Sequence, residues 1–124
     1  MAAEKQHRIV AVVDDDPRVR EALEHLLDSA GMEHKSFASA EEALQHGQLE
    51  SVDCLIADVR MPGIDGRELQ RRLSASLPRL PLIFVTAHHD DEVRQDILCR
   101  GAFAFLHKPF DGEELLNIVD AAVR

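Results

Sequence analysis

Five side chains of this sequence are of types that bind cations or anions, and each follows an apolar run. They are Asp14, Asp15, Asp58, Thr86 and Lys108. Apolar runs of four to eight residues that end in polar or turn-forming residues are typical of strands buried on both faces. Because the carboxyl ends of parallel strands lie at one edge of a sheet, we expect these five side chains to meet there.

Three aspartates in one cleft repel one another unless a cation lies among them. Carboxylate oxygens and a backbone carbonyl suit Mg²⁺, which binds through few protein groups and retains several waters. Lys108 adds a positive charge that can pair with a carboxylate or a phosphoryl oxygen, and the Thr86 hydroxyl can hydrogen-bond the same oxygen. A single aspartate such as Asp58 often only ends a strand, so this hypothesis rests on the whole set.

The elements that must position these residues alternate along the chain. Apolar and β-branched runs predict strands over 8–13, 52–57, 82–85 and 103–106, with a weaker candidate over 33–37. Capping residues and amphipathic spacing predict helices after Asp16, Ser39, Asp65 and Asp111, and one more that stops at Gly101. This alternation predicts an α/β fold, a doubly wound five-stranded parallel sheet of (βα)5 type with helices on both faces.

Other polar residues are expected to be structural. Asp16, directly before Pro17, is predicted to cap a helix rather than bind a metal. The segment from His88 to Asp91 is predicted to be a solvated loop rather than a transition-metal site. The polar segment 47–51 is likewise expected to be a loop.

Composition and charge limit the classes of function. The 124 residues are enough for one domain with its own core, and 14 basic against 23 acidic residues give a formal net charge of −9. That acidic surplus argues against nucleic-acid binding by this domain. No apolar run approaches the roughly 20 residues that cross a bilayer, and residues 1–8 lack the apolar core of a signal peptide. Cys54 and Cys99 form no CxxC motif and are expected to be buried thiols of a reduced, cytoplasmic protein.

The motifs together resemble the receiver domain of two-component response regulators. In chain order they are Val13-Asp14-Asp15, the loop from Asp58 to Gly63, Thr86-Ala87 and Lys108-Pro109-Phe110. The resemblance covers about residues 7–123, so residues 1–124 are expected to form a single receiver domain. The Asp-x-Arg-Met-Pro loop is similar to the FixJ- and LuxR-type branch, which feeds DNA-binding transcription factors. The resemblance also implies the flavodoxin-like strand order 2-1-3-4-5.

The resemblance assigns the acidic residues to phosphoryl transfer. It implies that Asp58 is the phosphoacceptor, which takes a phosphoryl group from a phosphohistidine of a sensor histidine kinase or phosphotransfer protein. Asp14, Asp15, Asp58 and the backbone carbonyl of Arg60 would bind Mg²⁺, with Mn²⁺ as a possible substitute. Such a domain is a signalling protein rather than an enzyme, since it catalyses only its own phosphorylation and dephosphorylation. A carboxylate is an accepted nucleophile for this chemistry.

The resemblance also implies how the signal is read out. Thr86 and Lys108 would bind the phosphoryl oxygens, and the peptide between Lys108 and Pro109 would be cis. Phe105 occupies the aromatic switch position, although it lacks the hydroxyl of the tyrosine that many relatives carry. The face formed by the fourth helix, fifth strand and fifth helix is the expected surface for output or for a homodimer.

Two alternatives from other classes remain. A haloacid-dehalogenase-like phosphohydrolase also uses an aspartyl nucleophile, but it needs a second aspartate two residues later, where this chain has Arg60. A receiver-like interaction module that is never phosphorylated is the second alternative. Such modules usually lose an acidic residue or the lysine, and this chain retains both.

Overall fold

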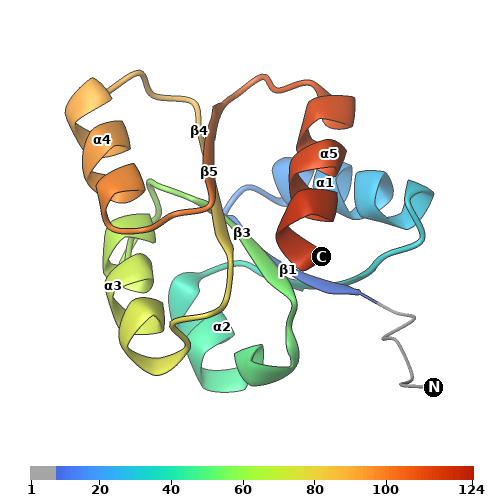
Figure 1. Ribbon diagram of the computed structural model, residues 1–124, viewed down its shortest axis with the longest axis horizontal. Helices are drawn as coiled ribbons and strands as arrows, with labels where there is room; N and C mark the ends of the chain where they lie inside the picture. The colour runs from blue at the N-terminus through green and yellow to red at the C-terminus, as the bar shows by residue number, and fades with distance from the viewer. Residues whose placement is uncertain (1–7) are drawn as a thin grey trace.

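The structure, a computed structural model, describes residues 8–124 and contains one five-stranded sheet (Figure 1). The strands are β1 (Ile9–Val13), β2 (Glu33–Phe37), β3 (Cys54–Asp58), β4 (Leu82–Thr86) and β5 (Ala104–His107). All neighbouring strands are parallel, and their order is β2-β1-β3-β4-β5. The predicted doubly wound α/β fold and its flavodoxin-like strand order are therefore confirmed. The expectation about a signal peptide concerns residues 1–8, which lie outside the described residues except for Arg8.

Within residues 8–124, five α-helices connect and follow the strands. They are α1 (Pro17–Ser29), α2 (Ala40–His46), α3 (Gly66–Ser76), α4 (Asp91–Cys99) and α5 (Gly112–Val123). The side chains of Asp16, Ser39, Asp65 and Asp111 accept backbone hydrogen bonds at their helix starts, which confirms the four predicted caps. None of the described helices is long and apolar enough to cross a bilayer.

Several sequence-based boundaries were wrong: the predicted strands 8–13, 82–85 and 103–106 each differ by one residue at one or both ends, and three further differences have local causes. Asp90 caps α4 and accepts from two backbone amides, so the helix takes up Asp91 and shortens the predicted loop. The segment expected to be a loop over 47–51 contains a short 3₁₀-helix, Leu49–Ser51. β3 begins at Cys54 rather than at position 52, because Val52 closes that 3₁₀-helix with a backbone bond to Leu49.

The core consists of two apolar layers, one on each face of the sheet. Side chains alternate along each strand, so Leu55 and Phe84 face one layer while Ile56 and Ile83 face the other. The first layer packs under α2, α3 and α4, and the second packs under α1 and α5 (Figure 1). The sheet is therefore covered on both faces, and its carboxyl edge is where polar groups from several strands can gather.

The two cysteines differ in environment. Cys54 lies in β3 and is fully buried, and its burial raises the pKa of the thiol to about 12. Cys99 lies at the end of α4 and is exposed, so the expectation that both thiols are buried was wrong for this residue. Ile97, the buried residue of the same helical turn, is two positions away, which corresponds to about 200° around a helix.

Candidate functional site

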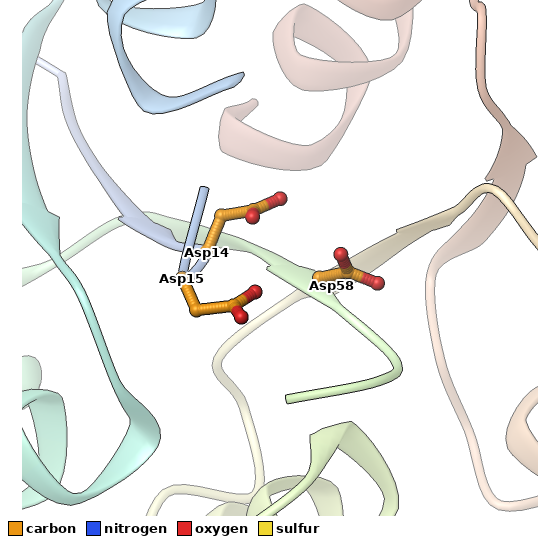
Figure 2. A group of neighbouring side chains, drawn as sticks. All are labelled: Asp14, Asp15 and Asp58. Carbon is orange, nitrogen blue, oxygen red and sulfur yellow. The ribbon is translucent and has the colours of Figure 1, made fainter. Parts of the chain in front are cut away.

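The predicted site residues come from the carboxyl ends of four strands. Asp14 follows β1, Asp58 and Thr86 are the last residues of β3 and β4, and Lys108 follows β5. The carboxylates of Asp14 and Asp15 extend from the end of β1 toward Asp58 (Figure 2). One oxygen from each of the three side chains lies within 4.8 Å of the others. The structure thus brings together residues that are far apart in the sequence.

Lys108 connects two of these carboxylates. Its ammonium lies 3.0 Å from Oδ2 of Asp14 and 2.9 Å from Oδ2 of Asp58. Asp14 is 1% exposed and Asp58 is 9% exposed, whereas Asp15 is exposed to solvent. The two less accessible carboxylates therefore share the Lys108 ammonium, whereas Asp15 is the most exposed of the three.

The pKa of Asp14 and the pKa of Lys108 are both shifted from their ordinary values. Burial raises the pKa of the Asp14 carboxyl above its ordinary value, against the lowering effect of the Asp16 amide and of Lys108. Burial also lowers the pKa of Lys108, but the hydrogen bonds and charges of Asp58 and Asp14 outweigh it, and the pKa is raised overall. Both pKa values can be raised at once. Lys108 has two carboxylate partners that favour its charged form, whereas Asp14 has only one ammonium partner, which Asp58 also contacts, to offset its burial.

Backbone groups fix the orientation of the acidic side chains. Oδ1 of Asp14 accepts a hydrogen bond from the amide of Asp16 at 2.9 Å, and Oδ1 of Asp58 accepts from the amide of Arg60 at 3.1 Å. The guanidinium of Arg20 on α1 donates to the carbonyl of Asp14 at 2.7 Å. Arg20 was not identified from the sequence, where it looks like one of many exposed helix arginines. Both buried carboxylates are thus held with one oxygen on a backbone amide and the other on Lys108.

Gly66 allows α3 to begin directly against the end of β3. A Cβ at this position would lie 2.7 Å from the carbonyl oxygen of Asp58 and 2.8 Å from Cα of Val59. The Gly66 amide donates to the carbonyl of Val59 at 2.7 Å. Any larger residue would push the helix away from the strand end that carries the candidate nucleophile.

Thr86 and Phe105 lie next to a pair of histidines that was not identified from the sequence. Thr86 is buried, and its hydroxyl accepts a hydrogen bond from the amide of His88 at 3.1 Å. Phe105 is half-buried and contacts the ring of His107 edge-on, with ring centroids 5.6 Å apart. The ring of His107 in turn stacks on that of His89, with centroids 4.2 Å apart. These contacts connect the loop after β4 with the face of β5.

The side chains of Arg60 and His88 are exposed. The peptide between Lys108 and Pro109 is cis, as the resemblance implies. Among residues 8–124, the three aspartates Asp14, Asp15 and Asp58 are the one cluster of three or more His, Cys, Asp or Glu side chains suited to holding a metal ion.

Comparison with known proteins decides what this arrangement belongs to. The family model of the response regulator receiver domain matches residues 10–120. The chain belongs to this family. Receiver domains of response regulators are signalling modules that interact with kinases or phosphotransfer proteins. The resemblance inferred from the strand-end motifs is therefore confirmed.

Two relatives of this chain are described as transcriptional regulators. It is 39% identical over 118 residues to the DNA-binding transcriptional regulator NtrC of Klebsiella pneumoniae, an alignment that covers 95% of this chain and 25% of NtrC. It is 37% identical over 115 residues to the transcriptional regulatory protein FixJ of Bradyrhizobium diazoefficiens, covering 93% of this chain and 56% of FixJ. The FixJ-type branch is thus among the relatives, and the chain spans about a quarter to a half of their length.

A solved structure supports the same assignment at the level of the fold. The crystal structure of a response regulator receiver protein from Pseudomonas putida superposes with a TM-score of 0.88 at 34% identity. The alignment covers 95% of this chain and 99% of that chain. The receiver fold described above is therefore shared along nearly the entire length of both proteins.

Proposed function

We propose that residues 1–124 form a single receiver domain, with its core at about 7–123, that accepts a phosphoryl group on Asp58. The observation that carries this proposal is the environment of the Asp58 carboxylate. It lies at the sheet edge, with Oδ1 on the Arg60 amide and Oδ2 on the Lys108 ammonium, and it retains 9% exposure. A nucleophile that is oriented by fixed donors and still reachable is suited to phosphoryl transfer, which depends mainly on positioning and charge.

In the proposed reaction, a carboxylate oxygen of Asp58 attacks the phosphorus of a phosphohistidine. The phosphorus–nitrogen bond breaks, and its electron pair returns to the imidazole of the partner protein. In this proposal Lys108 would hydrogen-bond one phosphoryl oxygen of the product, and the Thr86 hydroxyl would bond another. Hydrolysis of the acyl phosphate would later return Asp58 to its carboxylate form.

The donor set fits a hard divalent cation. Three carboxylates supply oxygens within 4.8 Å of one another, and one ammonium offsets only part of their charge. Asp14, Asp15, Asp58 and the Arg60 carbonyl would hold Mg²⁺ or Mn²⁺, and the bound ion would neutralise charge on the transferred group. Oxygen-only ligands of this kind suit these ions better than softer metals.

The partner would be a sensor histidine kinase or a phosphotransfer protein of the cytoplasm. A groove beside the site is lined mainly by apolar side chains, Val19, Ala22, Pro109 and Phe110, and reaches Lys108. A partner that seats there would bring its histidine to the sheet edge. With a net charge of −9, the domain itself is not suited to bind nucleic acid.

Phosphorylation would change the face formed by α4, β5 and α5, which serves as the output or homodimer surface in this proposal. The contacts from Thr86 through the loop after β4 to His107 and Phe105 provide a physical connection between the site and that face. A structural change at Thr86 can therefore be transmitted to β5 through these contacts.

Incubation with a small phosphodonor such as acetyl phosphate and Mg²⁺, followed by intact-protein mass spectrometry, tests the phosphoacceptor assignment. The wild type should gain one phosphoryl group, and Asp58→Asn should gain none. Asp120→Asn, which alters an exposed aspartate of α5, is the matched control and should behave as the wild type. A phosphoryl group that persists in Asp58→Asn would contradict the assignment of the nucleophile.

A further inference from the structure

The loop between β3 and α3 carries Arg60, whose carbonyl belongs to the proposed metal ligands. This loop is fixed at both ends by hydrogen bonds already described, from the Arg60 amide to Asp58 and from the Gly66 amide to Val59. Between these bonds the chain runs over Met61, Pro62 and Gly63. The position of the carbonyl therefore depends on what holds the middle of the loop.

A carboxylate from α2 holds the middle of this loop. Oε2 of Glu41 accepts a hydrogen bond from the amide of Ile64 at 3.1 Å, across 23 positions of sequence. Gly63 has a positive φ of 74°, and a Cβ at this position would overlap Oε2 of Glu41. The loop is thus shaped around the carboxylate, with a glycine where the two come closest.

The second oxygen of Glu41 makes this contact unusual. Oε1 is buried and has no hydrogen-bond partner among the described residues. A buried acceptor without a partner is unfavourable for folding, and such atoms are few in native structures. Among the described residues, the Ile64 amide is therefore the one hydrogen-bond partner of this carboxylate, which ties Glu41 to the loop.

We propose that Glu41 is a positioning residue for the phosphoryl-transfer site: it fixes the loop that presents the Arg60 carbonyl, and it thereby sets the affinity for Mg²⁺. The inference rests on the proposed function, because it assumes that the carbonyl is a ligand. Mg²⁺ demands near-octahedral geometry, so a ligand on a loosened loop binds it poorly. Loss of a group that orients a metal ligand typically weakens binding by about 10–100-fold.

The first test is Mg²⁺ titration by calorimetry and by amide NMR shifts, with Glu41→Ala, Glu41→Gln and Glu42→Ala. Glu41→Ala should weaken Mg²⁺ by about 10-fold. Glu41→Gln removes the charge but keeps an oxygen that can accept from Ile64, so it should restore most of the affinity. Glu42 is an exposed neighbour on the same helical turn, and Glu42→Ala should bind as the wild type.

A second pair of variants approaches the same contact from the loop. Gly63→Ala places a methyl group against Glu41, whereas Gly31→Ala adds one at the same φ of 74° with nothing within 4 Å. Both substitutions carry the strain of a positive φ, but only Gly63→Ala should weaken Mg²⁺. Combining it with Glu41→Ala should add little further loss, since both act on one contact.

The outcomes separate this inference from the proposed function. If the wild type binds Mg²⁺ and Glu41→Ala binds it equally well, the inference is overturned and the proposed function stands. If Glu41→Gln is as weak as Glu41→Ala, the effect is one of charge and the positioning role is wrong. If the wild type does not bind Mg²⁺, the metal site and the role of Glu41 both fail.

Discussion

The ammonium of Lys108 lies 2.9 Å from Oδ2 of Asp58, so the proposed phosphoacceptor is paired with a cation. The same ammonium also serves Asp14 at 3.0 Å. The Lys108 ammonium thus contacts two of the three clustered carboxylates and balances only part of their charge. The excess of negative charge makes the site suited to a divalent cation and unfavourable for the folded state without one.

Mg²⁺ should stabilise the folded protein through this site. Binding to the native state alone adds a stability that grows with ion concentration, about 2.7 kcal/mol at 100 times the dissociation constant. The measurement is the melting temperature in Mg²⁺ and in chelator, for the wild type and for Asp15→Ala. Asp15 is a proposed ligand, so the substitution should remove the Mg²⁺ effect. Because Asp15 is exposed, the melting temperature in chelator should change little. An undiminished Mg²⁺ effect in Asp15→Ala would refute the ligand assignment.

Asp14→Asn should stabilise the protein in chelator at neutral pH, by about 1 kcal/mol. Burial raises the pKa of Asp14 above its ordinary value of 3.8, so the native state binds the proton more tightly than the unfolded state. The free energy of unfolding therefore falls as pH rises from 3.8 through the raised pKa of the native state. Asparagine keeps an oxygen for the Asp16 amide and does not ionise; its amide nitrogen cannot accept from Lys108, which retains Asp58 as its acceptor. Its advantage in urea unfolding should therefore be present at neutral pH and disappear below 3.8, and an advantage independent of pH would count against this account.

Much of the site could be predicted because the signal is local. Asp14, Asp58 and Lys108 follow apolar runs directly, and parallel strands place their ends at one edge of a sheet. The order of the strands needed the resemblance, since hydrophobic patterns do not say which strands are neighbours. The motifs thus identified the chemical groups, and the topology placed them together.

The residues that support the site could not be predicted in the same way. Glu41 meets Ile64 across 23 positions, and the stacking of His89 on His107 depends on how a loop folds onto β5. No local pattern distinguishes such residues from solvated ones. The exposure of Cys99 was missed for a related reason, because helical periodicity defines the buried face only roughly at a helix end.

The two thiols should react at very different rates. Cys99 is exposed, whereas Cys54 is buried with its pKa raised to about 12, which leaves very little thiolate at neutral pH. A chromogenic disulfide reagent should label one thiol per native molecule and two in denaturant. Cys99→Ser should leave the native protein unreactive, and rapid native labelling of Cys99→Ser would show that Cys54 is accessible.

Arg60 and His88 should control the lifetime of the phosphoryl group. Arg60 lies two residues after Asp58, His88 lies two residues after Thr86, and both side chains are exposed. We expect Arg60→Ala and His88→Ala to speed phosphate loss several-fold by admitting water, while unfolding free energy changes by no more than about 0.5 kcal/mol. Decay is followed by mass spectrometry, with an exposed histidine of α1, in His25→Ala, as the control. If the decay curves of Arg60→Ala and His88→Ala overlay that of the wild type, the two residues do not control the lifetime of the phosphoryl group.

The switch should depend on Thr86 and Phe105. Phosphorylation adds about −1.5 to −2 charges to a chain whose formal net charge is −9, so we expect the Thr86 hydroxyl to move toward the new group with its loop. That loop carries His89, and its movement should separate His89 from His107. Phe105, which is half-buried and rests edge-on against His107, could then turn inward and fill the space that Thr86 leaves.

Amide NMR with beryllofluoride, a mimic of the phosphoryl group, checks this switch in the wild type, Asp58→Asn and Thr86→Ala. The wild type should shift around Phe105 and along α4, β5 and α5; Asp58→Asn should not bind the mimic, and Thr86→Ala should bind it with smaller shifts. Because close-packed cores favour discrete arrangements over gradual distortion, partial activation should appear as two populations rather than as intermediate shifts. If the wild type binds the mimic and the signals around Phe105 stay in place, Phe105 is not the switch, and the α4, β5 and α5 face must be reached by another route.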